Sequence, residues 1–320
     1  MDNLTHSLVG ALLGQAGLKR KTGLAMPALI IGANLPDVDA ACFFWLEGTE
    51  HLGFRRGITH GPPAWVLLPL VLTGVLYWFD RWQEGRGKRP EGRLPVHFGW
   101  LYGLSFIGCL SHPLFDWFNV YGIRLLEPFS SAWFYGDTLF IIDVWLWALL
   151  GLSVWWSLRT EKRGGAWKRP AWIGLVLTAI YIAGNTLWSI AHLGSFSVSN
   201  KDMEFPAETL IASPVALLPN QREIIVGREN EYYLVAAGEE PTRQNAKPLT
   251  KNRCSWPQMA AMRRTNSQLE AFLFWSRAPF AERAEDGSVI LRDARFYDPR
   301  ARDRFSIALP DVKCEELPAQ

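Results

Sequence analysis

The stretch FGWLYGLSFIGCLSHPLFDWF, residues Phe98–Phe118, decides how the fold of this chain is interpreted. It has the length and the apolar composition to cross a bilayer, which takes about 20 mainly apolar residues. Near its end it carries His112 and Asp116, which are four residues apart and so lie on one face of a helix. Ionisable groups at membrane depth are costly and usually face a protein interior or a water-filled cavity. The stretch therefore predicts a membrane-embedded helix that contributes ligands to a metal site.

Three further segments place metal-ligand side chains inside or beside apolar stretches. They are Leu4-Thr5-His6-Ser7, Asn34-Leu35-Pro36-Asp37-Val38-Asp39 and Arg56-Gly57-Ile58-Thr59-His60. Imidazole nitrogen combined with carboxylate oxygen is the ligand mix of catalytic zinc, and Mn²⁺ or Fe²⁺ tolerates the same mix. We therefore expect one or two divalent ions, with zinc preferred. The predicted metal ligands are His6, Asp37, Asp39, His60, His112 and Asp116.

Each of these residues also has a purely structural interpretation. His6 could be a helix-interface or capping residue, Asp37 could cap the helix that follows it, and His60 could lie in an exposed loop. His112 and Asp116 could form an internal hydrogen-bonded pair. The metal interpretation is favoured because all of these residues are predicted at one membrane depth.

Six apolar stretches predict the fold. Four have the length of a membrane span: Pro62–Phe79, Phe98–Phe118, Leu139–Leu158 and Pro170–Ile190. Leu24–Leu46 carries two carboxylates behind a proline, so we expect a broken or cavity-lining helix there. Leu4–Leu18 is short, and its Gly10–Gly14 spacing favours close helix packing. We predict an α-helical integral membrane bundle of about five to six membrane-embedded helices in residues 1–192, followed by a small α+β soluble domain in residues 193–320.

The basic residues orient the bundle through the positive-inside rule. The run Lys19-Arg20-Lys21 and the loops 81–93 and 159–169 are dense in Lys and Arg, so we place them in the cytoplasm. This topology puts the metal-ligand residues near the outer face and residues 193–320 outside the cytoplasm. Arg55 and Arg56 are predicted on the outer side, which is an exception to the positive-inside rule. This suggests a role near the site, such as binding an anionic substrate group.

Composition narrows the class of protein. Fourteen of the 16 tryptophans lie in residues 1–192, which suits a membrane-interface belt. The four cysteines form no CxxC pair, which argues against a closed structural zinc site, and spacing leaves a Cys254–Cys314 disulfide open. The chain has no GxSxG, P-loop or HExxH motif, which argues against a serine hydrolase, an NTPase and a zincin. The net charge is +2, and we expect no nucleic-acid partner.

The C-terminal residues alternate between strand and helix patterns. Glu223–Val226 and Tyr232–Val235 are predicted strands joined by a turn, and Gln258–Arg277 has helical spacing. Further strands are expected at Ala294–Tyr297 and Phe305–Leu309. Because residues 193–320 contain no histidine, we expect this domain to cover the site or to bind a partner rather than to supply ligands.

The four histidine and aspartate motifs, in this order, resemble the YdjM-like family over roughly residues 1–190. That family is described as LexA-regulated, membrane-bound, predicted metal-dependent hydrolases, so the resemblance implies a multi-pass protein of the bacterial inner membrane. The motif order is also similar, more distantly, to the zinc-dependent phospholipase C and single-strand nuclease superfamily. That similarity implies one metal on Asp39, His60, His112 and Asp116. It implies a second metal on His6, with Asp37 or a shared Asp116.

We therefore expect a membrane-bound metal-dependent hydrolase that acts on a lipid or phosphoester substrate near the outer leaflet. Asp37 is the candidate general base if it is not itself a ligand, and Arg55 or Arg56 would hold a phosphate. Two other classes remain open. One is a metal-ion or proton transporter, and the other is a non-enzymatic envelope protein with a structural metal. Neither the substrate nor the oligomeric state follows from the sequence.

Overall fold

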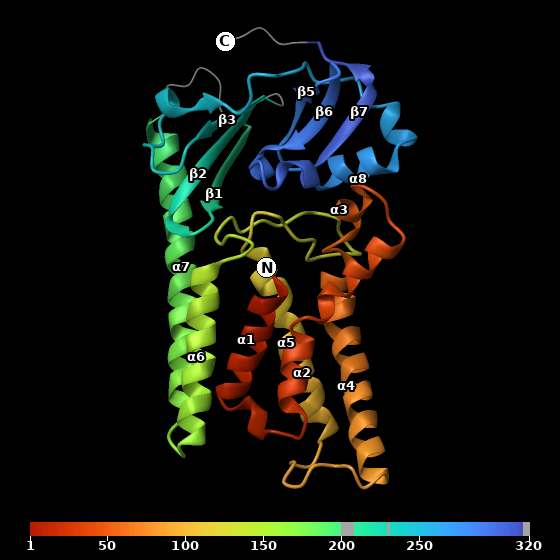
Figure 1. Ribbon diagram of the computed structural model, residues 1–320, viewed down its shortest axis with the longest axis vertical. Coiled ribbons are helices and arrows are strands. Elements are labelled where there is room, and N and C mark those ends of the chain that lie inside the picture. The colour runs from red at the N-terminus through yellow and green to blue at the C-terminus, as the bar shows by residue number, and fades with distance from the viewer. Residues whose placement is uncertain (200–207, 229–230, 316–320) are drawn as a thin grey trace. The chain divides into compact units, whose positions relative to one another are not determined.

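A computed structural model describes residues 1–199, 208–228 and 231–315 of the chain (Figure 1). The contacts between residues divide the chain into two compact units. The first unit consists of Met1–Asp39 and Arg56–Thr186, and the second consists of Ala40–Arg55 and Leu187–Gln320. The segment 40–55 thus groups with the C-terminal residues, although it lies between two of the histidine and aspartate motifs.

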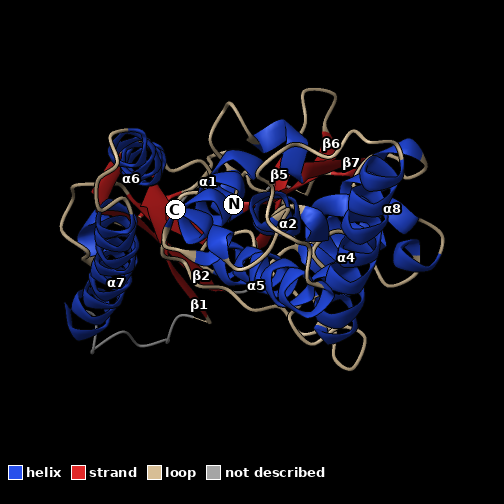
Figure 2. Cartoon of the chain, turned by 90° about the horizontal axis from the view of Figure 1, so that it is seen from below, coloured by secondary structure: helices blue, strands red, loops and turns tan. Residues whose placement is uncertain are grey.

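The first unit is helical. Its helices are α1 (Asn3–Gln15), α2 (Ala25–Gly32), α4 (Pro62–Gly85), α5 (Phe98–Trp117), α6 (Val144–Lys162) and most of α7 (Lys168–Ser199), with the 3₁₀ helices η1 (Leu18–Arg20) and η3 (Ile58–His60). Helix α2 packs against α1, α4 and α5, and α1 also packs against α6. Figure 2 shows α1, α2 and α5 next to one another.

Small residues allow this close packing. A Cβ atom at Gly10 of α1 would lie 2.6 Å from the carbonyl oxygen of Leu29 in α2, and a Cβ at Gly108 of α5 would lie equally close to the same oxygen. Both helices therefore approach α2 at one point, which larger residues would prevent. The predicted role of Gly10 in helix packing is confirmed. The consequence is that α1 and α5, each with a histidine, come together on α2.

The long apolar helices form where they were expected. Helices α4 and α7 are long and apolar enough to cross a membrane. The pair formed by α2 and the 3₁₀ helix η2 (Leu35–Phe44) passes the same test together and is bent by 50°, which confirms the predicted break in Leu24–Leu46. The described residues thus contain two candidate spans, or three if the bent pair is one span. Helices α5 and α6 are confirmed as helices, and their embedding in the membrane stays a prediction.

The second unit is α+β, as predicted. One antiparallel sheet has the order β1 (Thr209–Val215), β2 (Leu218–Arg228), β3 (Glu231–Val235) and β4 (Lys247–Pro248). A second antiparallel sheet has the order β5 (Pro279–Arg283), β6 (Ser288–Asp293) and β7 (Ser306–Lys313). The unit also contains α3 (Glu50–Phe54), α8 (Ser267–Trp275) and short 3₁₀ helices at Arg243–Asn245, Met262–Arg264, Ala294–Phe296 and Arg302–Phe305.

Two details of the C-terminal prediction were wrong. The helix predicted at Gln258–Arg277 is shorter, because Asn266 caps α8 by accepting a hydrogen bond from Leu269 N at 2.9 Å. The strand predicted at Ala294–Tyr297 is instead a 3₁₀ helix, because the side chain of Asp293 accepts a hydrogen bond from Arg295 N and turns the chain. The turn predicted between β2 and β3 falls partly on residues 229–230, outside the described residues.

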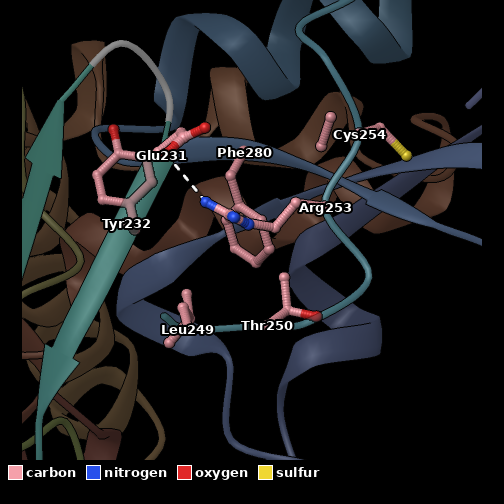
Figure 3. Close-up of a pocket in the computed structure, with 8 residues that line it drawn as sticks. Glu231, Tyr232, Leu249, Thr250, Arg253, Cys254 and Phe280 are labelled. Carbon is pink, nitrogen blue, oxygen red and sulfur yellow. Dashed lines mark hydrogen bonds and ion pairs between the residues drawn. The ribbon is translucent and has the colours of Figure 1, made fainter. Parts of the chain in front are cut away.

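Cys254 and Cys314 form a disulfide in this unit. Figure 3 shows Cys254 beside a small pocket that is also lined by Tyr232 and Phe280. Arg253 Nη1 pairs with Glu231 Oε2 across the pocket at 3.0 Å. The pocket is therefore lined by an ion pair and by aromatic side chains. None of the residues that line it is a histidine that could bind a metal.

We expect the double change Cys254→Ala and Cys314→Ala to lower the free energy of unfolding of the C-terminal unit by about 2–4 kcal/mol, because the bond restricts the unfolded chain. Thermal unfolding with and without a reducing agent measures the effect. The reductant should reproduce the loss in the wild type and have no effect on the double variant. An unchanged midpoint in the double variant would contradict the expectation.

Candidate metal centre

Three histidines from separate elements of the first unit converge on one carboxylate. The Nε2 atom of His6, in α1, lies 3.4 Å from Asp116 Oδ1. The Nε2 atoms of His60, in η3, and of His112, in α5, lie 3.6 Å and 3.5 Å from Asp116 Oδ2. All four residues are fully buried. The structure thus brings together side chains that are up to 110 residues apart in the sequence.

Hydrogen bonds at the far ring nitrogens orient two of these imidazoles. His112 Nδ1 lies 2.7 Å from the carbonyl oxygen of Ala33, which can only accept, so Nδ1 carries the proton and Nε2 presents its lone pair to Asp116. His60 Nδ1 contacts Thr59 Oγ1 at 2.9 Å. The ring of His6 stacks on that of His112, with the centroids 3.7 Å apart. Among the described residues, the three Nε2 atoms have no hydrogen-bond partner.

The spacing of these atoms fits a divalent cation. Two groups of side chains have ligand atoms that all lie within 4.8 Å of one another: His6, Asp37 and His112, and His60, His112 and Asp116. Ligands at about 2.1 Å from a tetrahedral zinc are about 3.4 Å apart, close to the separations between the Nε2 atoms and the Asp116 oxygens. The donor set of imidazole nitrogen and carboxylate oxygen also fits. The buried histidines and aspartates could therefore hold a metal ion.

The two aspartates of η2 have different surroundings. Asp37 Oδ1 lies 3.7 Å from His112 Nε2, and 11% of the Asp37 side chain is exposed. Asp39 Oδ2 accepts hydrogen bonds from Arg56 N at 2.8 Å and from Thr59 Oγ1 at 3.0 Å. Asp39 therefore bonds to two residues of the segment 56–60 that carries His60. Asp39 belongs to neither group of clustered ligand atoms. Its role as a metal ligand stays a prediction.

Arg56 is part of the cluster. It has a left-handed backbone, with φ 55°. Its Nε atom pairs with Asp116 Oδ2 at 3.1 Å, and its Nη1 atom donates to Asn119 Oδ1 at 3.0 Å. The guanidinium of Arg55 lies 5.6 Å from the ring centre of Phe43, within the second unit. The sequence left both arginines open as anion-binding residues, and the structure places Arg56 beside the clustered histidines.

Three groups at the cluster were not predicted. Thr59 bridges Asp39 and His60, and Asn119 holds Arg56. The amino group of Met1 contacts Asp116 Oδ1. Asn119 lies two residues beyond the end of α5, so helical spacing gave no signal for it. Nothing in the sequence pattern singles out the Thr59 hydroxyl, because its partners come from the fold.

The other three histidines have local roles. His97 caps the start of α5, where its Nδ1 accepts a hydrogen bond from Trp100 N. The Nδ1 atoms of His51 and His192 lie within hydrogen-bonding distance of the Gly48 and Trp188 carbonyl oxygens. These residues provide controls for experiments on the cluster.

We expect Thr59→Val to weaken metal binding by about 10–100-fold, as replacement of residues that orient ligating histidines does elsewhere. The change keeps the shape of the side chain and removes the hydroxyl that contacts both Asp39 and His60. Competition with a metal-chelating dye measures the affinity. Thr73→Val is the matched control, because Thr73 is a buried threonine that bonds Ser105 instead. Equal affinities in the two variants would contradict the expected role of Thr59.

Comparison with known proteins agrees with the resemblance carried by the motifs. A family model described as "YdjM inner membrane protein" matches residues 1–191. "Uncharacterized protein YfhP" of Bacillus subtilis (strain 168) is 26% identical over 167 residues, which cover 49% of this chain and 47% of the relative. The chain thus spans about half the length of this curated relative. No solved structure matches the chain.

Proposed function

The chain belongs to the YdjM inner membrane protein family, and from this premise we propose that it is a membrane-bound metal-dependent hydrolase acting on a lipid or phosphoester substrate. One observation carries the proposal. Three fully buried imidazole Nε2 atoms without hydrogen-bond partners among the described residues surround the carboxylate of Asp116. Buried polar atoms nearly always have a partner, and a divalent cation would satisfy all three nitrogens at once.

His60, His112 and Asp116 would hold one ion, and His6 with Asp37 could hold a second. His112 belongs to both groups, but its Nδ1 atom is engaged by Ala33, so its single lone pair can serve only one ion. When bound, zinc or a similar metal lowers the pKa of a coordinated water and polarises the scissile group. Thiolates are absent from both groups, which favours a catalytic ion over a closed structural one.

Asp37 suits the role of general base if it does not itself hold a second ion. It is the least buried carboxylate of the cluster, with 11% of its side chain exposed, whereas Asp39 and Asp116 are buried. Partial exposure lets a proton taken from the attacking water pass on to solvent. Asp37 also lies beside His112, so it is within reach of the atoms that would react.

Arg56 suits the binding of an anionic group. Its guanidinium is planar and always charged, and Asp116 and Asn119 hold two of its nitrogens in place. A phosphoester oxygen between Arg56 and the metal ligands would meet a fixed positive charge. This supports a phosphoester as the substrate class over a neutral ester.

The membrane setting supports a lipid substrate. The family is one of inner membrane proteins, and the described residues contain two or three candidate spans. The Cys254–Cys314 disulfide favours an oxidising compartment for the C-terminal domain, since disulfides persist outside the cytoplasm. We therefore place the C-terminal domain on the extracytoplasmic side and the site near the outer leaflet.

The test is turnover by the full chain in nanodiscs. Protein loaded with Zn²⁺, Mn²⁺ or Fe²⁺ is incubated with a panel of phospholipids and prenyl phosphates, and released phosphate and headgroups are measured. We expect release by the wild type and none by His112→Ala. A metal-loaded wild type that releases neither product overturns the proposal. Metal flux into proteoliposomes without turnover would point to transport instead.

A further inference from the structure

The segment 40–55 leaves the metal centre and returns to it. It begins after Asp39 and ends before Arg56, and the hydrogen bond from Arg56 N to Asp39 Oδ2 closes its base at 2.8 Å. Thr59 Oγ1 donates to the same oxygen at 3.0 Å. The position of this segment therefore affects both residues at its base, and through them His60 and Asp116.

The tip of the segment packs on α8 of the C-terminal domain. It contains α3, which lies beside α8 within the second unit (Figure 1). Thr49 Oγ1 donates to the carbonyl oxygen of Gln268 at 2.8 Å, and Ser267 Oγ donates to Glu50. Two polar contacts thus join one turn of chain to the start of α8.

A close steric contact completes this interface. A Cβ atom at Gly53 would lie 3.1 Å from the Cβ and 3.2 Å from the Cα of Ala271, so α3 and α8 touch where neither has a large side chain. Helix α8 is itself anchored, because Leu269, Phe272 and Trp275 are fully buried. Helix α8 is therefore a fixed surface against which α3 is held.

We propose that α8 positions the metal centre by holding α3, which lies in the segment whose two ends adjoin Asp39 and Arg56. Arg56 supports this step, because its left-handed backbone persists in a non-glycine residue only when the surrounding structure enforces it. The family match ends at residue 191, so α8 lies outside the matched region. The inference rests on the proposed metal centre and assigns the C-terminal domain a role in it.

The experiment uses one substitution to create a clash between α3 and α8, and a second substitution to reduce that clash. Gly53→Val places a branched side chain against Ala271, and adding Ala271→Gly removes the atom nearest to the new Cβ. Gly194→Val is the matched control, because a Cβ at Gly194 meets no atom within 4 Å. Each full-length variant is loaded with Co²⁺, and its affinity and visible absorption spectrum are compared with those of the wild type.

We expect Gly53→Val to weaken Co²⁺ binding by about 10-fold or more and to change the absorption bands, as misplacement of residues behind the ligands does. Gly53→Val with Ala271→Gly should recover most of the loss, and Gly194→Val should match the wild type. Thr49→Val, which removes one hydrogen bond and adds no bulk, should shift both readouts in the same direction.

The outcomes distinguish the two proposals. A wild type that binds no Co²⁺ overturns the metal centre itself. A wild type that binds Co²⁺, with Gly53→Val indistinguishable from Gly194→Val, overturns the positioning role of α8 and leaves the metal centre standing.

Discussion

Asp116→Asn should abolish metal binding and lower hydrolytic activity by about 10³-fold or more, which corresponds to roughly 4 kcal/mol of activation free energy. All three clustered histidines approach the carboxylate of Asp116, at 3.4 to 3.6 Å, and Asp116 also pairs with Arg56. Asparagine keeps the shape of the side chain and replaces one acceptor oxygen by an amide donor. The negative charge that attracts the cation is lost, so the effect isolates charge from packing.

Metal analysis of the purified protein checks this directly. Asp80→Asn is the matched control, because Asp80 of α4 is likewise a buried aspartate paired with arginines, here Arg89 and Arg93 in the loop after α4. It should lower the thermal midpoint and leave the metal content unchanged. Metal retained in Asp116→Asn, or lost equally in Asp80→Asn, would refute the assignment of Asp116.

Arg56→Lys should lower kcat/KM by about 10²–10³-fold while the bound metal remains, comparable to the loss of one preorganised donor at other active sites. Lysine keeps the charge and loses the planar fork. One ammonium group cannot pair with Asp116 where Nε does and also reach Asn119 and Gly122 where Nη1 does. The anion-binding charge would therefore move, although its sign is unchanged.

Arg93→Lys is the matched control for this prediction. Arg93 lies in the same unit as Arg56 and likewise pairs with a buried aspartate, here Asp80 at 3.2 Å. Turnover of a phospholipid in nanodiscs, measured together with metal content, separates binding of substrate from binding of metal. Equal losses in the two variants, or a loss of metal in Arg56→Lys, would contradict the proposed role of Arg56.

The helical bundle and the approximate positions of its members could be predicted because apolar length is a local property of the chain. The break near Pro36 was predictable for the same reason, since two carboxylates beside a proline cannot continue a lipid-exposed helix. The strand at Ala294–Tyr297 was mispredicted because the Asp293 side chain competes for the backbone there. A local hydrogen bond outweighed the pattern of apolar residues.

The choice between neighbouring candidates could not be made from the sequence. Arg55 and Arg56 are adjacent and chemically identical, and only the fold shows that Arg56 pairs with Asp116 among the histidines. Asp37 and Asp39 were equally plausible ligands. The hydrogen bonds that Asp39 accepts from Arg56 N and Thr59 give it a different environment from that of Asp37.

The side chains that could form a metal site were recognisable from local pattern, because ionisable residues are rarely kept in apolar stretches without a function. How these side chains meet depends on the fold. The carbonyl of Ala33 orients His112, and the packing of α1 and α5 on α2 stacks His6 beside it. The contact of α3 with α8 was likewise invisible in the sequence. These contacts join residues far apart in the chain, so they depend on the fold as a whole rather than on any local pattern.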